Sequence, residues 1–175
     1  VASIHTMLVQ KRSLKSTDGI GRYAKTNLIL SILTYVLVLY STFLTRSGVL
    51  GDASVHSFVD PGNLVYFFLL IFISTFIVIG IGGIVYRWKY LEDKTVYEES
   101  TLSRELALFT ASIILVASAI IVLVGTSAPL FGQAVDTFFY DEMHLPIGII
   151  IGLLNGLSLL IKWKSTNTKD LIKDS

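Results

Sequence analysis

The stretch from residue 64 to residue 86, LVYFFLLIFISTFIVIGIGGIVY, decides the fold of this chain. It carries no charged side chain. An apolar run of about 17–25 residues, rising about 1.5 Å per residue, is long enough to cross a hydrocarbon core of about 30 Å. In lipid the backbone has no water to bond with, so such a segment has to be helical. The stretch therefore predicts a transmembrane helix.

Three further apolar runs have the same character, at Asn27 to Thr45, Leu106 to Leu130 and Leu145 to Ile161. The chain is 53% hydrophobic and only 15% charged. Core helices of a large soluble protein would leave too little polar surface at this composition. We therefore expect an all-α, polytopic helical membrane protein with four full transmembrane helices. Val1 to Gln10 reads as the last turns of a preceding helix, so we expect an internal piece of a longer protein.

Composition also narrows the chemistry. There is no cysteine in the chain, which excludes disulfide scaffolds and thiolate metal sites here. Any metal must therefore be held by histidine or oxygen ligands. The net charge of +1 gives no basic surface for nucleic acid. No motif resembles a nucleotide-binding loop, a zinc-protease helix or a nucleophile elbow.

The basic residues predict the orientation. Thirteen of the fourteen lie in the segment 11–26, the segment 87–105 or the tail that begins at Lys162, and Arg46 is the exception. By the positive-inside rule these loops and the C-terminus face the cytoplasm, while the loops 46–62 and 131–144 face outward.

Local signals mark two helix ends and one packing site. Ser103 is placed to cap the third span, with Glu105 in its first turn, where the helix dipole favours a carboxylate. Pro129 predicts where that span stops or kinks. The glycines at positions 80, 82 and 83 are better explained by close helix packing than by phosphate binding.

Arg46 lies in the most unusual loop, TFLTRSGVLGDASVHSFVDPG from residue 42 to residue 62. A guanidinium at the outer end of a helix can bind a carboxylate through two parallel hydrogen bonds, and haem propionates are carboxylates. Alternatively, Arg46 reaches to lipid phosphate or pairs with Asp52 or Asp60.

Three histidines are candidates for metal or cofactor chemistry. His56, in the same loop, could ligate haem iron or be an ordinary surface residue. His5 lies among apolar residues, where an ionisable group is a functional candidate, although an interfacial histidine is the alternative. His144 lies beside Asp141 and Glu142, and a hydrated helix entry explains these residues better than a cation site.

The order of these elements resembles the cytochrome c maturation protein F (CcmF) family of haem lyases. The resemblance is carried by HTMLV from His5, TFLTRSGVL from Thr42, SVHSF from Ser54 and LSRE from Leu102. It extends from His5 to Trp163, with the elements in family order. It implies that residues 1–60 end a cytochrome c assembly, haem-handling domain, and that 61–175 are the following transmembrane helices.

The resemblance also implies a function and ligands. The family delivers haem at the outer face of the bacterial inner membrane, which is therefore the location expected for this chain. There it attaches haem to apocytochrome c, together with other cytochrome c maturation membrane proteins. By resemblance, His56 ligates the delivered haem, and His5 ligates a second, b-type haem that reduces the first. The propionate role of Arg46 is our own hypothesis. If the intact protein is an enzyme, the implied activity is that of a cytochrome c haem lyase.

The resemblance does not place a complete haem site within these residues. The family's tryptophan-rich haem-binding segment would precede Val1, and the second histidine for the membrane haem would follow Ser175. Two alternatives to haem handling stay open at this point. One is a segment of a transporter or channel, which would need polar groups along a pathway at mid-membrane. The other is a structural assembly subunit without a cofactor.

Overall fold

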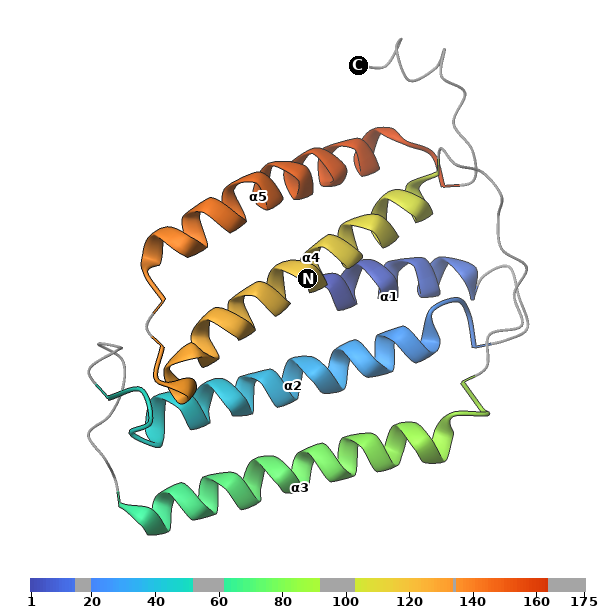
Figure 1. Ribbon diagram of the computed structural model, residues 1–175. Helices are drawn as coiled ribbons and strands as arrows, with labels where there is room; N and C mark the ends of the chain where they lie inside the picture. Colours follow the sequence, from blue (N-terminus) through green and yellow to red (C-terminus); the bar gives the residue numbers. More distant parts are fainter. Residues whose placement is uncertain (15–19, 52–61, 92–102, 134, 164–175) are drawn as a thin grey trace.

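Every element of the computed structural model is a helix within the residues that it describes, which are 1–14, 20–51, 62–91, 103–133 and 135–163 (Figure 1). The elements in chain order are α1 (Ala2–Ser13), α2 (Ala24–Arg46), α3 (Asn63–Arg87), α4 (Arg104–Ser127), the short 3₁₀ helix η2 (Ala128–Phe131) and α5 (Thr137–Leu160). The predicted all-α class is confirmed.

Four of these helices, α2, α3, α4 with η2, and α5, are long and apolar enough to cross a membrane. The four predicted transmembrane helices are therefore confirmed. The ends of α2 and α3 agree with the apolar runs within a few residues, because the chain changes to polar residues at those points. The multi-pass character of the chain follows from length and hydropathy alone.

The helices pack as a single row rather than as a closed bundle (Figure 1). Contacts join α3 to α2, α2 to α1, α1 to α4, and α4 to α5. The short α1 thus lies between α2 and α4, while α3 and α5 form the two edges of the row (Figure 1). No residue of α3 is buried, and large apolar side chains are exposed on all four long helices. Such surfaces suit lipid as the solvent.

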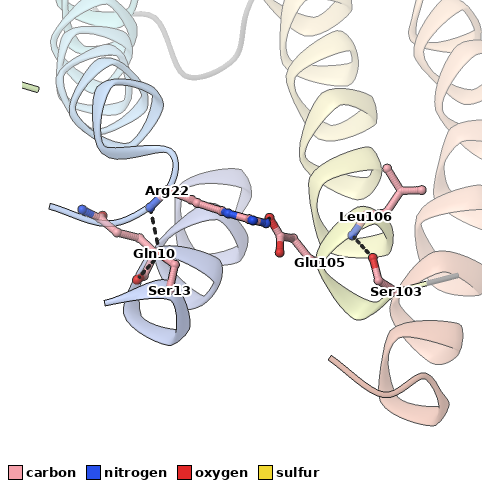
Figure 2. A network of polar contacts seen from close by, with 6 residues as sticks. All are labelled: Gln10, Ser13, Arg22, Ser103, Glu105 and Leu106. Atoms are coloured by element: carbon pink, nitrogen blue, oxygen red, sulfur yellow. Dashed lines mark hydrogen bonds and ion pairs between the residues drawn. The ribbon is translucent and has the colours of Figure 1, made fainter. Parts of the chain in front are cut away.

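At one end of the row a polar network joins α1, the start of α2 and the start of α4 (Figure 2). The guanidinium of Arg22 pairs with the carboxylate of Glu105 at 2.5 Å, and both side chains are largely buried. The backbone N–H of Arg22 donates to Ser13 Oγ at 2.8 Å, and that hydroxyl donates to the carbonyl of Gln10. The segment between α1 and α2 is thereby tied to α4.

Gln10 extends this network toward α2. Its side-chain amide donates to the carbonyl of Ile20 at 2.8 Å, and Asn27 donates to Gln10 Oε1. Ser103 Oγ accepts from the backbone N–H of Leu106 at 3.2 Å, so the predicted cap of the third span is confirmed (Figure 2). These bonds satisfy donors and acceptors that would otherwise be desolvated at the helix ends.

At the other end of the row, α4 stops where Pro129 was predicted to stop it, and η2 follows. The next helix begins earlier than the hydropathy suggested: α5 starts at Thr137, not near Leu145. Asp136 caps it by accepting from Phe138 N at 3.4 Å, and Pro146 lies inside the helix. The predicted outer loop 131–144 is correspondingly shorter, because a capped helix can begin before its apolar run does.

Close packing of the span glycines is observed at one of the three positions. A Cβ built on Gly80 would lie 2.6 Å from Ile32 of α2, so the two helices approach closely there. Gly82 and Gly83 have nothing within 4 Å among the described residues. A second close approach, which the sequence did not reveal, joins α4 to α5: a Cβ built on Gly125 would lie 2.5 Å from the hydroxyl of Tyr140.

Candidate functional site

His5 lies on the face of α1 that packs against the other helices. His5, Thr6 and Val9 are the buried residues of α1, while Ile4 and Leu8 are exposed. Small hydroxyl residues hold this face close to both neighbours: Ser3 Oγ lies 3.4 Å from Ser31 Oγ of α2, and Ser112 Oγ of α4 donates to the carbonyl of Ala2 at 3.3 Å. The histidine is therefore enclosed by protein rather than by lipid.

The contacts of α1 with α2 also give the depth of His5. Gln10 is level with Asn27 and Ser3 is level with Ser31, so His5 lies between these two levels. At about 1.5 Å per residue, His5 therefore lies roughly 5–10 Å from the level of the first residue of α2, toward the middle of the span. His5 thus lies inside the spanning region, nearer the end that carries the Arg22–Glu105 pair.

The ring of His5 has the chemistry of a single iron ligand. Its Nδ1 is buried and has no hydrogen-bond partner in the described part of the chain. No group of three or more metal-ligating side chains forms among the described residues. A haem brings its own four equatorial nitrogens, so isolated axial ligands suffice to hold it. A lone buried imidazole such as His5 therefore fits one axial position of a haem.

Arg46 lies at the opposite end of the row, as the last residue of α2. The backbone N–H of Ser47 donates to the carbonyl of Phe43 at 2.9 Å, and Gly48, with φ +76°, ends the helix in the left-handed conformation. Ser47, Phe43 and Leu44 are buried, whereas Arg46 is exposed. Arg46 thus lies at the very end of the candidate spanning helix, with its side chain exposed.

The structure does not bring His5 and Arg46 together. Measured along α2 at about 1.5 Å per residue, the point level with His5 lies roughly 24 Å from Arg46. His56 lies outside the described residues. The two candidates that the structure places therefore belong to two different depths of the membrane.

A groove between α2 and α4 lies beside the Arg46 end, and sequence reasoning missed it. Its volume is about 520 Å³, and its lining is Leu37, Tyr40, Ser41, Leu44, Thr45, Leu50, Ala119, Val122, Leu123 and Thr126. A second cavity of about 380 Å³ shares Leu37, Ala119 and Leu123 with it and reaches the first residues of α1. The only sequence feature that could have pointed to this groove was a set of hydroxyl residues within apolar spans.

One polar contact crosses this region between α2 and α4. The hydroxyls of Tyr40 and Ser127 lie 2.7 Å apart, and Ser127 also donates to the carbonyl of Leu123. Phe43 packs against the rings of Tyr40 and, on α3, Tyr66. The groove is therefore apolar and aromatic with a few hydroxyls, a lining that suits a flat, largely apolar ligand.

His144 lies inside α5 rather than at a hydrated helix entry. Its Nδ1 is 3.0 Å from the carbonyl of Tyr140 and donates a hydrogen bond to it. Nε2 is buried without a partner in the described part of the chain. Asp141 and Glu142 are exposed, and the three residues do not form a metal-holding group.

The chain was compared with known proteins. It matches no family model and no solved structure. The cytochrome c-type biogenesis protein CcmF of Haemophilus influenzae is 32% identical over 162 residues, covering 87% of this chain and 24% of the relative. CcmF of Escherichia coli strain K12 is 30% identical over 161 residues, covering 86% of this chain and 24% of the relative.

A differently named relative gives a similar result. The probable cytochrome c-type biogenesis protein NrfE of Escherichia coli strain K12 is 28% identical over 169 residues, covering 91% of this chain and 29% of the relative. The chain thus spans about a quarter of the length of the two CcmF proteins above. Along nearly its whole length, this chain is a homologue of the CcmF family of cytochrome c-type biogenesis proteins.

Proposed function

We propose that this chain is part of a protein that binds haem and attaches it to apocytochrome c at the outer face of the bacterial inner membrane. The observation that carries the proposal is the similarity, over more than four-fifths of the chain, to proteins named for cytochrome c-type biogenesis. Other cytochrome c maturation membrane proteins are the partners that this role requires.

In this proposal His5 is an axial ligand of a b-type haem within the membrane. Its burial between helices and its unpartnered Nδ1 support the assignment. A bound haem would supply a centre that accepts and donates one electron. The chain's own contribution is to hold the imidazole in a site enclosed by α1, α2 and α4 and shielded from water, where a ligand–iron bond does not compete with hydration.

His56 and Arg46 would act on the delivered haem at the outer face. An imidazole can ligate the iron, and a guanidinium can hold a propionate through two hydrogen bonds. Support for Arg46 comes from its place at the end of α2, exposed and next to a groove whose lining includes Thr45 and Leu50. The groove would receive the apolar part of the porphyrin while the carboxylates stay at the aqueous boundary.

The orientation is part of the proposal. The described basic residues of the loops 11–26 and 87–105 lie at the end of the row opposite Arg46. By the positive-inside rule that basic end faces the cytoplasm and Arg46 faces outward. Because this chain contains no cysteine, Gly51→Cys and Lys89→Cys each add one thiol to it, whose labelling is measured against the unsubstituted protein. A membrane-impermeant thiol reagent added to intact cells should label the first and not the second, and the reverse would overturn the proposed mechanism.

The deciding experiment is a haem absorbance spectrum of the intact purified protein with single histidine changes. We expect His5→Ala to abolish the b-type haem signal, and His56→Ala to abolish cytochrome c maturation while the b-type signal stays. His144→Ala is the matched control, since that imidazole is half-buried and not assigned to haem, and both readouts should be unchanged. Normal cytochrome c levels in His56→Ala would overturn the attachment role. Absence of any Soret band, with partner binding intact, would favour a structural assembly subunit.

A further inference from the structure

Two arginines from different helices meet over one tryptophan at the basic end of the row. The guanidinium carbon of Arg104, the first residue of α4, lies 5.1 Å from the centre of the Trp163 ring. That of Arg12, in the last turn of α1, lies 5.9 Å from the same ring. Trp163 follows the end of α5 and is half-buried. Three helix ends therefore converge on this indole.

The convergence is built into the fold rather than made by loose side chains. The backbone N–H of Arg104 donates to the carbonyl of Lys162 at 3.0 Å, which joins the start of α4 to the residue before the tryptophan. Ser103, beside it, is buried and caps α4. α1 reaches the same place because it packs along α4. The three side chains are thus held near one another before any ligand arrives.

The charges in this cluster are not balanced by the acid nearest in sequence. The carboxylate of Glu105 is bound to Arg22. Nε of Arg104 is buried and has no hydrogen-bond partner in the part of the chain that the structure describes. Two cations near one ring repel each other, and each attraction to the ring is only about 0.5–2 kcal/mol. An anion between the guanidiniums would remove the repulsion and satisfy the buried donor.

The position of the cluster identifies the anion. Trp163 lies just beyond the end of a spanning helix, where indoles sit at the level of lipid headgroups. The surrounding helix ends are basic, with Lys11 in α1 and Lys162 after α5 both exposed. We propose that Arg12, Arg104 and Trp163 form a binding site for the phosphate group of an anionic phospholipid. The guanidiniums bind the phosphate oxygens, and the indole packs against the upper part of the acyl chains.

This site goes beyond the proposed haem function and does not depend on it. It would join α1, α4 and α5 through one lipid headgroup, close to the Arg22–Glu105 pair that already ties α1 and α2 to α4. It requires only that the four long helices cross a bilayer.

The test is native mass spectrometry of the intact protein, released from detergent after incubation with phosphatidylglycerol or with phosphatidylcholine. We expect phosphatidylglycerol to be retained preferentially, and Arg104→Gln and Arg12→Gln each to weaken its retention about tenfold, as loss of one charge-assisted contact implies. Lys11→Gln removes the same charge one residue from Arg12 but leaves the contact of Arg12 with the Trp163 ring, and it should change retention less than about twofold. Arg12 is exposed, so its variant tests the site even if Arg104→Gln unfolds the start of α4.

Three outcomes would overturn the proposal. The first is equal retention of the two lipids. The second is retention of phosphatidylglycerol that is the same in the wild type and both arginine variants, as expected if acidic side chains of the chain itself neutralise the guanidiniums. The third outcome concerns inorganic phosphate, added to protein that has bound phosphatidylglycerol. If millimolar phosphate displaces phosphatidylglycerol completely, the site binds free phosphate and not a headgroup.

Discussion

The two ends of the helix row are held together in different ways. At the basic end a buried ion pair and a series of side-chain to backbone hydrogen bonds join α1, α2 and α4. At the Arg46 end the links include a hydroxyl pair, Tyr40 with Ser127, the packing of Tyr140 on Gly125, and the ring contact of Phe43 with Tyr66. A groove of about 520 Å³ lies between α2 and α4 at this second end.

This difference indicates which end of the row contributes more to stability. In lipid, apolar side chains gain little by leaving the solvent for a neighbouring helix, so polar ties and close packing have to hold helices together. The basic end is rich in such ties. The other end is more open, and it presents Arg46 next to a groove. We therefore expect substitutions at the basic end to affect folding most, and substitutions at the Arg46 end to affect haem handling with smaller effects on folding.

The largest effect should come from breaking the buried ion pair. Glu105→Ala leaves the guanidinium of Arg22 largely buried without its carboxylate, since the Arg22 side chain is only 9% exposed. We expect a loss of about 3 kcal/mol in the free energy of unfolding, near the lower end for a buried pair because Glu105 retains some exposure. Thermal or denaturant unfolding in detergent micelles measures it.

The matched control for this prediction is Glu142→Ala, because Glu142 is an exposed carboxylate near the other end of the row. Its change in unfolding free energy should stay within about 0.5 kcal/mol. Equal effects of the two substitutions would contradict the view that the basic end carries the stability.

A smaller effect is expected where α4 and α5 approach most closely. In Gly125→Ala the new Cβ would lie 2.5 Å from the hydroxyl of Tyr140, so that side chain has to move. The ring can shift because the contact is at its far end, and we expect a loss of about 1–2 kcal/mol, typical of modest overpacking. The midpoint of thermal unfolding reports this change.

Gly148→Ala is the matched control, since a Cβ there meets nothing within 4 Å among the described residues. Replacing glycine by alanine inside an uncrowded helix stabilises it by about 0.5–1 kcal/mol. The two variants should therefore shift stability in opposite directions. A stabilising Gly125→Ala would mean that the α4–α5 contact is looser than its geometry indicates.

The smallest effect should come from the hydroxyl pair at the Arg46 end. Tyr40→Phe removes the 2.7 Å contact with Ser127 and keeps the ring. Interhelical hydrogen bonds in membrane proteins contribute about 0.6 kcal/mol on average. A double-mutant cycle of Tyr40→Phe with Ser127→Ala isolates that coupling. Tyr35→Phe, on the exposed face of the same helix, is the control and should show no coupling to Ser127→Ala.

Much of the fold was predictable because the relevant signals are local. Charge-free runs of sufficient length predicted the four spans, and Ser103 and Pro129 predicted where α4 begins and stops. The start of α5 was predicted about eight residues too late, because hydropathy registers Asp141, Glu142 and His144 as polar. Capping by Asp136 starts the helix before its apolar run begins.

The candidate site was only partly predictable. His5 and Arg46 stood out as residue types in unexpected surroundings, but their separation by most of a membrane thickness required the packing of α1 against α2. The groove could not be predicted, because its lining comes from two helices that are distant in sequence and separated by α1 over part of their length. His144 seemed a surface residue, and its buried Nε2 depends on where α5 meets its neighbours.

Hydropathy and charge along single segments were enough to predict lipid as the solvent, the number of spanning helices and the helix ends that share a side. The order of the row, with α1 inserted between α2 and α4, depends on tertiary contacts. That order rests on contacts such as Arg22 with Glu105, which are 83 residues apart. Local hydropathy cannot encode such a pairing, since every apolar face is equally well solvated by lipid and the choice of neighbour falls to a few polar and close-packed contacts.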